Sequence, residues 1–273
     1  MTRDPIPGRV LAVAATSAVV ALVVVVPLAA VVWAAHGITP ARLAALLGAP
    51  RTLAAFGLTF GAAAVASLVD VVIGVWAAWV LTTRTFPGRA LLDAVVDLPF
   101  ALPTAVTGIT LATLYGPHGW FGAPLLEHGI RVAYTPLGIV LALAFVGFPF
   151  VVRTVQPVLA GLPRDLGDAA RGLGASSFAV IARVTLPLAL PAIATGFALA
   201  FARTLGEYGS VVFIAGNFPG RTEIVPLLVL THLEEYDQAG AAAIATVMLA
   251  AALVLVLAIN ALQRRIVRVH SGA

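Results

Sequence analysis

The sequence contains no lysine and no cysteine. All 16 basic residues are arginines, and charged residues make up only 10% of the 273 positions. Without lysine the chain cannot form a Walker A loop, so it cannot hold ATP phosphates by that route. Without cysteine, disulfides, thiolate nucleophiles and cysteine-ligated metals are excluded, and the redox compartment is not indicated. Any use of ATP therefore requires a partner subunit.

The sequence also shows no catalytic or metal-binding constellation. Its five histidines fall in expected loops or in the C-terminal tail, without H-E-x-x-H or similar ligand spacing. They are His36, His118, His128, His232 and His270. We expect solvated or interfacial histidines, no cofactor or metal site in this chain, and no enzymatic activity of its own.

Hydrophobic residues make up 61% of the chain, and the mean hydropathy is +1.05, far above soluble domains. A membrane-spanning helix needs about 20 apolar residues. The sequence predicts an all-α membrane protein with six such helices, each bounded by Arg, Pro or Gly. These are Val10–Ala35, Leu53–Leu81, Ala94–Tyr115, Pro136–Val155, Pro191–Ala215 and Ala239–Leu262. Because the first run is longer than a signal-peptide core, it predicts an uncleaved helix.

The arginines predict the orientation of these helices. With the N-terminus inside, the outer loops hold only Arg42, Arg51, Arg131 and Arg221, Arg203 lies within a span, and the other arginines face the cytoplasm. This asymmetry predicts both termini inside, with cytoplasmic tails at 1–9 and 263–273 around one transmembrane domain, 10–262. Because the arginines are dispersed between apolar runs, lipid is the expected partner and nucleic acid is not.

The cytoplasmic loop 161–190 is the most informative stretch. Pro163 can begin a short helix, along which Leu162, Leu166 and Leu173 recur at helical spacing. Asp168 and Arg171 can pair on the opposite face. Two interpretations are equally consistent with these residues alone. The helix either returns the chain to the membrane or docks in a groove on a cytoplasmic partner.

A family resemblance favours docking. Asp168-Ala169-Ala170, then Gly174, then Val184-Thr185-Leu186-Pro187 resembles the EAA loop of ATP-binding-cassette (ABC) importer permeases, with Asp for Glu and Val for Ile. In that family the loop forms a coupling helix in a cleft of the ATPase subunit. The resemblance implies a type I permease fold and an ATPase-coupling role for a set of loop residues. They are Arg164, Asp165, Asp168, Ala169, Ala170, Gly174, Leu186 and Pro187.

Several polar or helix-breaking residues fall at expected membrane depth, where charged side chains are costly and face a cavity or a partner. Arg203 and Glu207 stand four apart near the middle of the fifth predicted helix. They either line a pathway, with Arg203 as a transient anion contact, or form a packing pair. Asp97 and Pro103 lie where prolines interrupt the third helix, which favours a pathway or a kinked packing helix equally. Asp70, in the second helix, also requires an interior position.

The outer segment 217–237 is half apolar. It predicts a short helix that folds back over the mouth of the pathway, and Asn217 at its start is included among the tentative pathway residues. The predicted pathway set is therefore Asp97, Pro103, Arg203, Glu207 and Asn217.

Longer segments of the sequence resemble one particular group within this permease family. The segments DLPFALPTAVTGITLATLYGPHGW, YTPLGIVLALAFVGFPFVVRTVQPVL and ARTLGEYGSVVFIAGN with TEIVPLLVLTHLEEYD resemble the T-type permease of sulfate/thiosulfate importers, within the molybdate/sulfate permease group. This implies half of an anion pathway in a bacterial inner membrane, working by ATP-driven alternating access. It also implies three partners: an ATPase subunit dimer that binds ATP and Mg, a related W-type permease, and a periplasmic sulfate/thiosulfate-binding protein.

Two alternatives remain open. Molybdate or tungstate permeases share the coupling loop and the A-R-x-L-G-E-[FY]-G stretch, so the transported oxyanion is not fixed. An ion-coupled secondary anion transporter would explain the intramembrane charges, but it gives no reason for the loop around Asp168.

Overall fold

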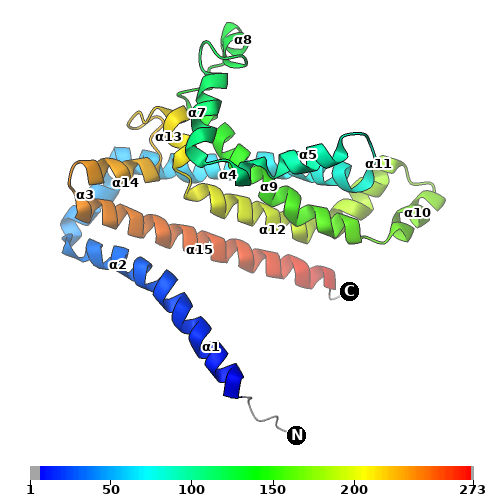
Figure 1. Cartoon of the computed structure of the whole chain (residues 1–273), viewed down its shortest axis with the longest axis horizontal. Coiled ribbons are helices and arrows are strands. Elements are labelled where there is room, and N and C mark those ends of the chain that lie inside the picture. The colour runs from blue at the N-terminus through cyan, green and yellow to red at the C-terminus, as the bar shows by residue number, and fades with distance from the viewer. Residues whose placement is uncertain (1–6, 272–273) are drawn as a thin grey trace.

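The computed structural model describes the backbone of residues 7–271 and the side chains of residues 10–163, 165–259 and 261. Helices make up its regular structure, and no strand occurs among residues 7–271. The predicted tails at 1–9 and 263–273 lie largely outside the described side chains. Figure 1 shows a bundle of long helices with the first helix leading away from it. The all-α prediction is confirmed.

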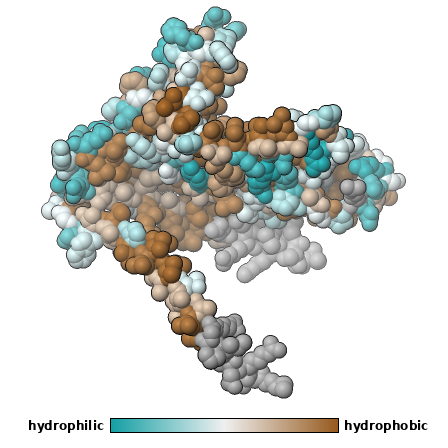
Figure 2. Space-filling view, viewed as in Figure 1, coloured by the Kyte–Doolittle hydropathy of each residue, from teal (hydrophilic) through white to brown (hydrophobic). Residues whose placement is uncertain are grey.

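The described part of the chain has five helical segments long and apolar enough to cross a membrane. They are Val10–Gly37, Pro50–Thr83, Pro136–Gly161, Ser177–Leu205 and Gln238–Ile259. They correspond to α1–η2, α4 (Pro50–Thr83), α9 (Pro136–Gly161), α11–α12 and the first part of α15 (Gln238–Ser271). Figure 2 shows hydrophobic residues along α1 and α2 and more hydrophilic residues towards both ends of the bundle.

Two of these segments contain a π-helical turn. The first runs α1 (Pro7–Val20), η1 (Ala21–Val25), α2 (Val26–Ala34) and η2 (Ala35–Gly37). The later one runs α11 (Ser177–Val180), η3 (Ile181–Thr185) and α12 (Leu186–Leu205). Each π turn ends two residues before a proline, Pro27 or Pro187, whose missing N–H and bulky ring disturb the i→i−4 pattern. A proline at this place can end or bend a helix; Pro187 does not end this one, which continues through it into α12.

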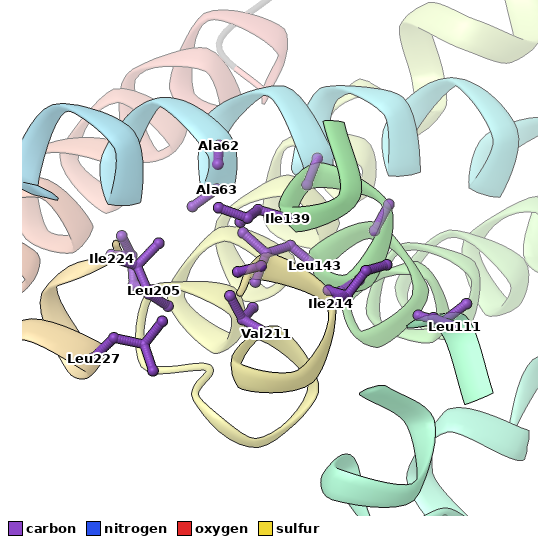
Figure 3. Close-up of a cluster of buried hydrophobic side chains, with 14 of the residues drawn as sticks. Ala62, Ala63, Leu111, Ile139, Leu143, Leu205, Val211, Ile214, Ile224 and Leu227 are labelled. Atoms are coloured by element: carbon purple, nitrogen blue, oxygen red, sulfur yellow. The ribbon is translucent and has the colours of Figure 1, made fainter. Parts of the chain in front are cut away.

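The centre of the bundle is a three-helix contact among α4, α9 and α12. Gly74 on α4 and Gly196 on α12 both lie against Val151 of α9. A β-carbon at Gly196 would stand 3.0 Å from the Val151 α-carbon, so the two backbones approach closely. Small residues permit such packing in lipid, where association depends on van der Waals contact. The same helices contribute to a buried apolar cluster with α7 and α13, shown in Figure 3 through Ile139, Leu143 and Ile214.

The predicted third span, 94–115, is divided in the structure. Its residues form α5 (Arg89–Val96), α6 (Leu98–Ala101) and α7 (Thr104–Tyr115). Leu102 is extended because a residue before proline is disfavoured in the helical region, and Pro103 follows it. α7 then projects from the bundle towards α8 (Gly122–Glu127), as Figure 1 shows.

The fifth predicted span ends earlier than Ala215. α12 ends at Leu205, and α13 (Gly209–Ala215) is a separate helix. Arg203 therefore lies in the last turn of α12, and Glu207 lies between the two helices, so placing this pair near mid-helix was wrong. The chain turns at Gly206–Tyr208, and the Glu207 carboxylate, one residue before the N-cap Tyr208, accepts a 3.0 Å hydrogen bond from the Ser210 N–H in the first turn of α13.

One end of the bundle carries α3 (Pro40–Gly48) and α14 (Val225–Glu234), and the other carries α10 (Arg164–Gly172), as Figure 1 shows. The short helix predicted within 217–237 is confirmed as α14. Its Val225, Leu227 and Leu228 are buried, and the N–H of Val225 donates to the Thr59 hydroxyl on α4 at 2.8 Å.

Candidate functional site

α10 forms a short helix with well-defined ends in the loop 161–190. Pro163 precedes it, and Leu173 follows it as the C-cap. Gly174 adopts a left-handed conformation with φ of +86°. The Gly174 N–H donates to the Arg171 carbonyl oxygen, and the Ala175 N–H donates to the Ala170 carbonyl oxygen. These two bonds form the Schellman motif. Glycine is favoured here because a side chain at positive φ would be strained.

The faces of α10 differ in character. The predicted ion pair forms: the Arg171 guanidinium donates to the exposed Asp168 carboxylate at 2.5 Å. Ala169 is exposed and Ala170 half-buried. The side chain of Arg164, which was also predicted to contribute, lies outside the described part of the chain. Asp165 is exposed in the first turn, where a carboxylate complements the helix dipole.

Two large apolar side chains beside α10 are exposed to solvent and were absent from the predicted coupling set. Leu173 is 91% exposed, and Phe178, at the start of the next helix, is 78% exposed. Leu173 had been assigned only to the apolar stripe, and no sequence signal separated Phe178 from a membrane-facing residue. Large apolar side chains this exposed at a hydrophilic end of a bundle are typical of a contact surface.

A four-residue turn, 173–176, joins α10 to the next helix. From the sequence either Ser176 or Ser177 could cap that helix; Ser176 does so, accepting the Ala179 N–H at 3.2 Å. From there α11, η3 and α12 run without interruption to Leu205. Leu186 and Pro187 lie at the start of α12, just after the π turn, and both are exposed.

At the far end of α12, Arg203 and Glu207 form an ion pair of 2.8 Å. The Glu207 side chain is only 3% exposed, whereas that of Arg203 is 36% exposed. Glu207 also accepts both the N–H and the hydroxyl of Ser210 at 3.0 Å. Glu207 is thus the structural member of the pair, and Arg203 is the accessible one.

α7 packs tightly on the α13 end of this region. A β-carbon at Gly209 would lie 2.2 Å from the Thr104 hydroxyl oxygen, and one at Gly108 would lie 2.4 Å from the Ser210 carbonyl oxygen. The structure therefore brings the Pro103–Thr104 break beside the segment that carries Glu207. Asn217 lies beyond the opposite end of α13, with φ of +48° and a buried side-chain oxygen that has no hydrogen-bond partner among the described residues.

Asp97 belongs to a different cluster. The Arg153 guanidinium donates to both Asp97 carboxylate oxygens and to one Asp93 carboxylate oxygen, each at 2.7 Å. Gln156 completes the group, accepting from Arg153 at 2.7 Å. The cluster ties α5 to α9. The predicted pathway residues therefore fall into separate groups, with Asp97 held at α9 and the Arg203–Glu207 pair beside α13.

The Arg153 cluster predicts a pH dependence of stability. The hydrogen bond from Arg153 is the main cause that lowers the pKa of Asp93; burial acts against it, and Gln156 and the charges of Arg153 and Arg89 add to the lowering. A carboxyl with a lowered pKa in the folded state stabilises the protein above its unfolded pKa of about 4. That contribution to stability is lost as the pH falls through the pKa of Asp93 in the folded protein.

We expect the melting temperature of the detergent-solubilised protein to fall more steeply with acidification below about pH 4 for the native chain than for Asp93→Asn. Thermal unfolding measured by size-exclusion fluorescence checks this. Glu127→Gln, at an exposed carboxylate on α8, serves as the control. Equal slopes for the native chain and Asp93→Asn would contradict the assignment.

Two further acidic residues, Glu223 and Asp70, are buried. Glu223, whose side chain is fully buried, forms a bidentate pair with Arg51 at 2.6 and 2.7 Å, fixing the segment before α14 to the start of α4. Asp70 on α4 is fully buried against α9 and α12, and neither carboxylate oxygen has a partner among the described residues. The predicted interior position of Asp70 is confirmed. No three described His, Asp or Glu residues lie close enough together to hold a metal ion.

Comparisons with known proteins agree with this architecture. Residues 70–269 match the family described as binding-protein-dependent transport system inner membrane component. The chain is 46% identical over 264 residues to the sulfate transport system permease protein CysT of Salmonella typhimurium, covering 97% of this chain and 95% of the relative. It is 48% identical over 239 residues to a probable sulfate transport system permease protein, cysT, of Nephroselmis olivacea, covering 88% and 84%.

Among solved structures, the fold is similar to a chain of a bacterial alginate ABC transporter in complex with an alginate pentasaccharide-bound periplasmic protein. The TM-score is 0.77 at 18% identity, and the match covers 94% of each chain. A chain of the methionine transporter MetNI in inward-facing conformations is also similar, with a TM-score of 0.54 at 21% identity over 78% of this chain and 92% of that one. At these identities the likeness shows the fold.

Proposed function

Since the chain belongs to the family of binding-protein-dependent transport system inner membrane components, we infer that it is the permease subunit of an ATP-driven sulfate importer. Sulfate is proposed as the substrate because the chain is 46% identical in sequence to a sulfate permease over 97% of its length. The chain is a transport subunit, and ATP is hydrolysed by a partner. The absence of lysine, and so of a Walker A loop, agrees with this division of labour.

In this proposal α10 is the coupling helix. Its position at one end of the bundle, its exposed apolar neighbours Leu173 and Phe178, and the short turn that joins it to the continuous α11–η3–α12 helix support this role. Closure of an ATPase dimer on ATP and Mg would move α10 and, through η3, the start of α12. Asp168, Ala169 and Ala170 would face the ATPase cleft, and Gly174 would fix the end of the helix.

The membrane topology follows from the same proposal. Residues 94–115, from the end of α5 through α7, would make the third crossing, giving six, with both termini and the loop 161–190 in the cytoplasm and one transmembrane domain over 10–262. The other partners would be a second permease subunit and a periplasmic anion-binding protein. None of the described residues of the first segment, Val10–Gly37, has a buried side chain within this chain, which leaves that segment free to contact lipid or the second permease.

The anion would pass the accessible side of Arg203. A conduit should bind its ion weakly enough to release it, and an arginine already paired with Glu207 at 2.8 Å meets that need. The sequence allowed either a pathway pair or a packing pair. The geometry favours a different role for each residue: Glu207 maintains the structure, and Arg203 contacts the anion.

We expect Arg203→Gln to fold, because Ser210 still donates to Glu207 and the glutamine amide can replace one Arg203 hydrogen bond, and to reduce sulfate uptake by about tenfold, the effect of roughly 1.4 kcal/mol. Arg203→Lys keeps the charge and should retain more uptake. Glu207→Ala should instead lower thermal stability by about 1–3 kcal/mol, because Ser210 and Arg203 lose their partner. Native rates for Arg203→Gln would favour a purely structural pair.

The experiment that tests the function is uptake of labelled sulfate by sealed vesicles containing the assembled importer. Uptake should require both ATP and the binding protein. Uptake driven by an ion gradient alone would overturn the proposal in favour of a secondary transporter. Competition by unlabelled thiosulfate, molybdate and tungstate orders the oxyanions, and a preference for molybdate would replace sulfate in the proposal while leaving the importer mechanism unchanged.

A further inference from the structure

A cavity lies at the base of α10, where this helix meets the rest of the bundle. Its volume is about 830 Å³, and it is lined by the end of α4, the start of α5, the end of α9, and α10 through η3 to the start of α12. Cavities of about 300–1,000 Å³ are typical of sites for small molecules. Of the predicted coupling set only Asp168 is among the lining residues, which also include Val184 and Thr185 of the EAA-type pattern.

The charged groups of this cavity are mostly cationic. Arg84, Arg89 and Arg171 line it, against the single carboxylate of Asp168. Arg171 is paired with Asp168, whereas neither Arg84 nor Arg89 forms an ion pair with any described side chain. Neither guanidinium thus has an ion-pair partner among the described side chains, and Asp93, the carboxylate whose charge interacts with Arg89, is already paired with Arg153, so this side of the cavity suits an anionic ligand.

The rest of the lining combines apolar and polar side chains. The apolar ones include the buried Leu159 and Val180 and the more exposed Leu188, and the uncharged polar ones are Thr82, Thr83, Gln156, Ser177 and Thr185. Near the arginines, Trp79 lies under the Arg84 guanidinium at 5.2 Å from the ring centre, a cation–π contact that holds this arginine in place. Tryptophan is also enriched at membrane–water interfaces. The cavity therefore combines a cationic rim with an apolar floor at the end of the membrane-spanning helices α4 and α9.

We propose that this cavity binds a tetrahedral oxyanion group through Arg84 and Arg89, and that the group is the phosphate of an anionic membrane lipid. A free oxyanion such as sulfate would satisfy the arginines but would leave most of the volume and the apolar floor unfilled. A lipid places its phosphate at the rim and its glycerol and upper acyl chains over Leu159 and Val180. Arginine forks match phosphate oxygens in geometry.

Occupancy of this site has a mechanical consequence. The occupant would contact α4 and α9 on one side and α10 and η3 on the other, so it would hold the coupling helix against the bundle. This consequence rests on the proposed function, because it requires α10 to be the coupling helix. The binding itself does not, and it is measured separately from transport.

The test uses the assembled importer purified in detergent, and the variant is Arg84→Gln/Arg89→Gln. The matched control is Arg131→Gln/Arg221→Gln, which removes two exposed arginines elsewhere on the chain. Native mass spectrometry after incubation with phosphatidylglycerol should show lipid retained by the native complex and the control. Retention by the Arg84/Arg89 variant should fall by about tenfold or more, with an unchanged melting temperature.

A second arm distinguishes the source of the oxyanion. Labelled sulfate is dialysed against the complex in phosphatidylcholine nanodiscs, which carry no anionic lipid. Arginine-dependent sulfate binding without arginine-dependent lipid retention would keep the site but assign it to a free anion. Equal lipid retention and equal sulfate binding by the native complex, the variant and the control would overturn the proposal, whatever the outcome of the uptake experiment.

Discussion

Replacing Leu173 and Phe178 together by serine is expected to weaken docking of the ATPase subunit by about a hundredfold, and to reduce sulfate uptake at least tenfold. Both side chains are held out from the α10 end of the bundle, 91% and 78% exposed, where neither contributes to the core of the chain. Truncating a hot-spot side chain at an interface costs about 2 kcal/mol or more, so two such anchors would account for the roughly 2.8 kcal/mol of a hundredfold loss. Co-purification with the tagged ATPase subunit measures docking directly.

The control for this experiment is Leu233→Ser/Tyr236→Ser. These residues form a similar leucine and aromatic pair, 47% and 90% exposed, at the opposite end of the bundle beside α14. The control variant should retain its ATPase subunit. If the Leu173/Phe178 variant also retains it and transports at the native rate, the α10 end is not the docking surface, and the coupling role of α10 fails with it.

The features that the sequence predicted well are those set by neighbouring residues. The helix α10, its Asp168–Arg171 pair and the Ser176 cap each depend on residues within four positions, so local pattern was sufficient. α14 was likewise evident from its short apolar run. The long spans were evident from hydropathy alone, because a membrane requires about 20 apolar residues whatever the tertiary packing.

The features that could not be predicted join distant segments. Arg153 meets Asp97 56 residues away, and Arg51 meets Glu223 172 residues away. Each arginine looked like a topology marker in the sequence, because helices that are apolar all round give no indication of which side faces a neighbour. The end of α12 at Leu205 was missed for a different reason: the Glu207–Ser210 hydrogen bonds are local, but the apolar run on both sides of them predicted one unbroken helix.

The contact between Asp70 and Gly147 predicts the largest loss of stability. Asp70 is fully buried on α4, and a β-carbon added at Gly147 on α9 would stand 2.2 Å from one of its carboxylate oxygens. The same β-carbon would lie 3.3 Å from the Thr204 methyl carbon and 3.4 Å from the Ala200 β-carbon on α12, so it would be crowded from two helices. We expect Gly147→Ala to destabilise the fold by about 2–3 kcal/mol through overpacking, measured as a lower melting temperature and folded yield.

Removing the Asp70 carboxyl should restore the stability lost in Gly147→Ala. Such a rescue would show that the loss comes from the contact with Asp70 and not from a general intolerance of alanine at position 147. Asp70→Ala/Gly147→Ala should regain most of the stability, with a coupling of at least about 1 kcal/mol in the double-mutant cycle. Gly57→Ala is the control, since a β-carbon there meets nothing within 4 Å in this chain, and alanine favours the helix. If the double variant is as unstable as Gly147→Ala alone, the added β-carbon clashes with Thr204 and Ala200 and not with Asp70. A stable Gly147→Ala would mean that α4 and α9 do not meet at Asp70, and the three-helix centre would then have to be rebuilt.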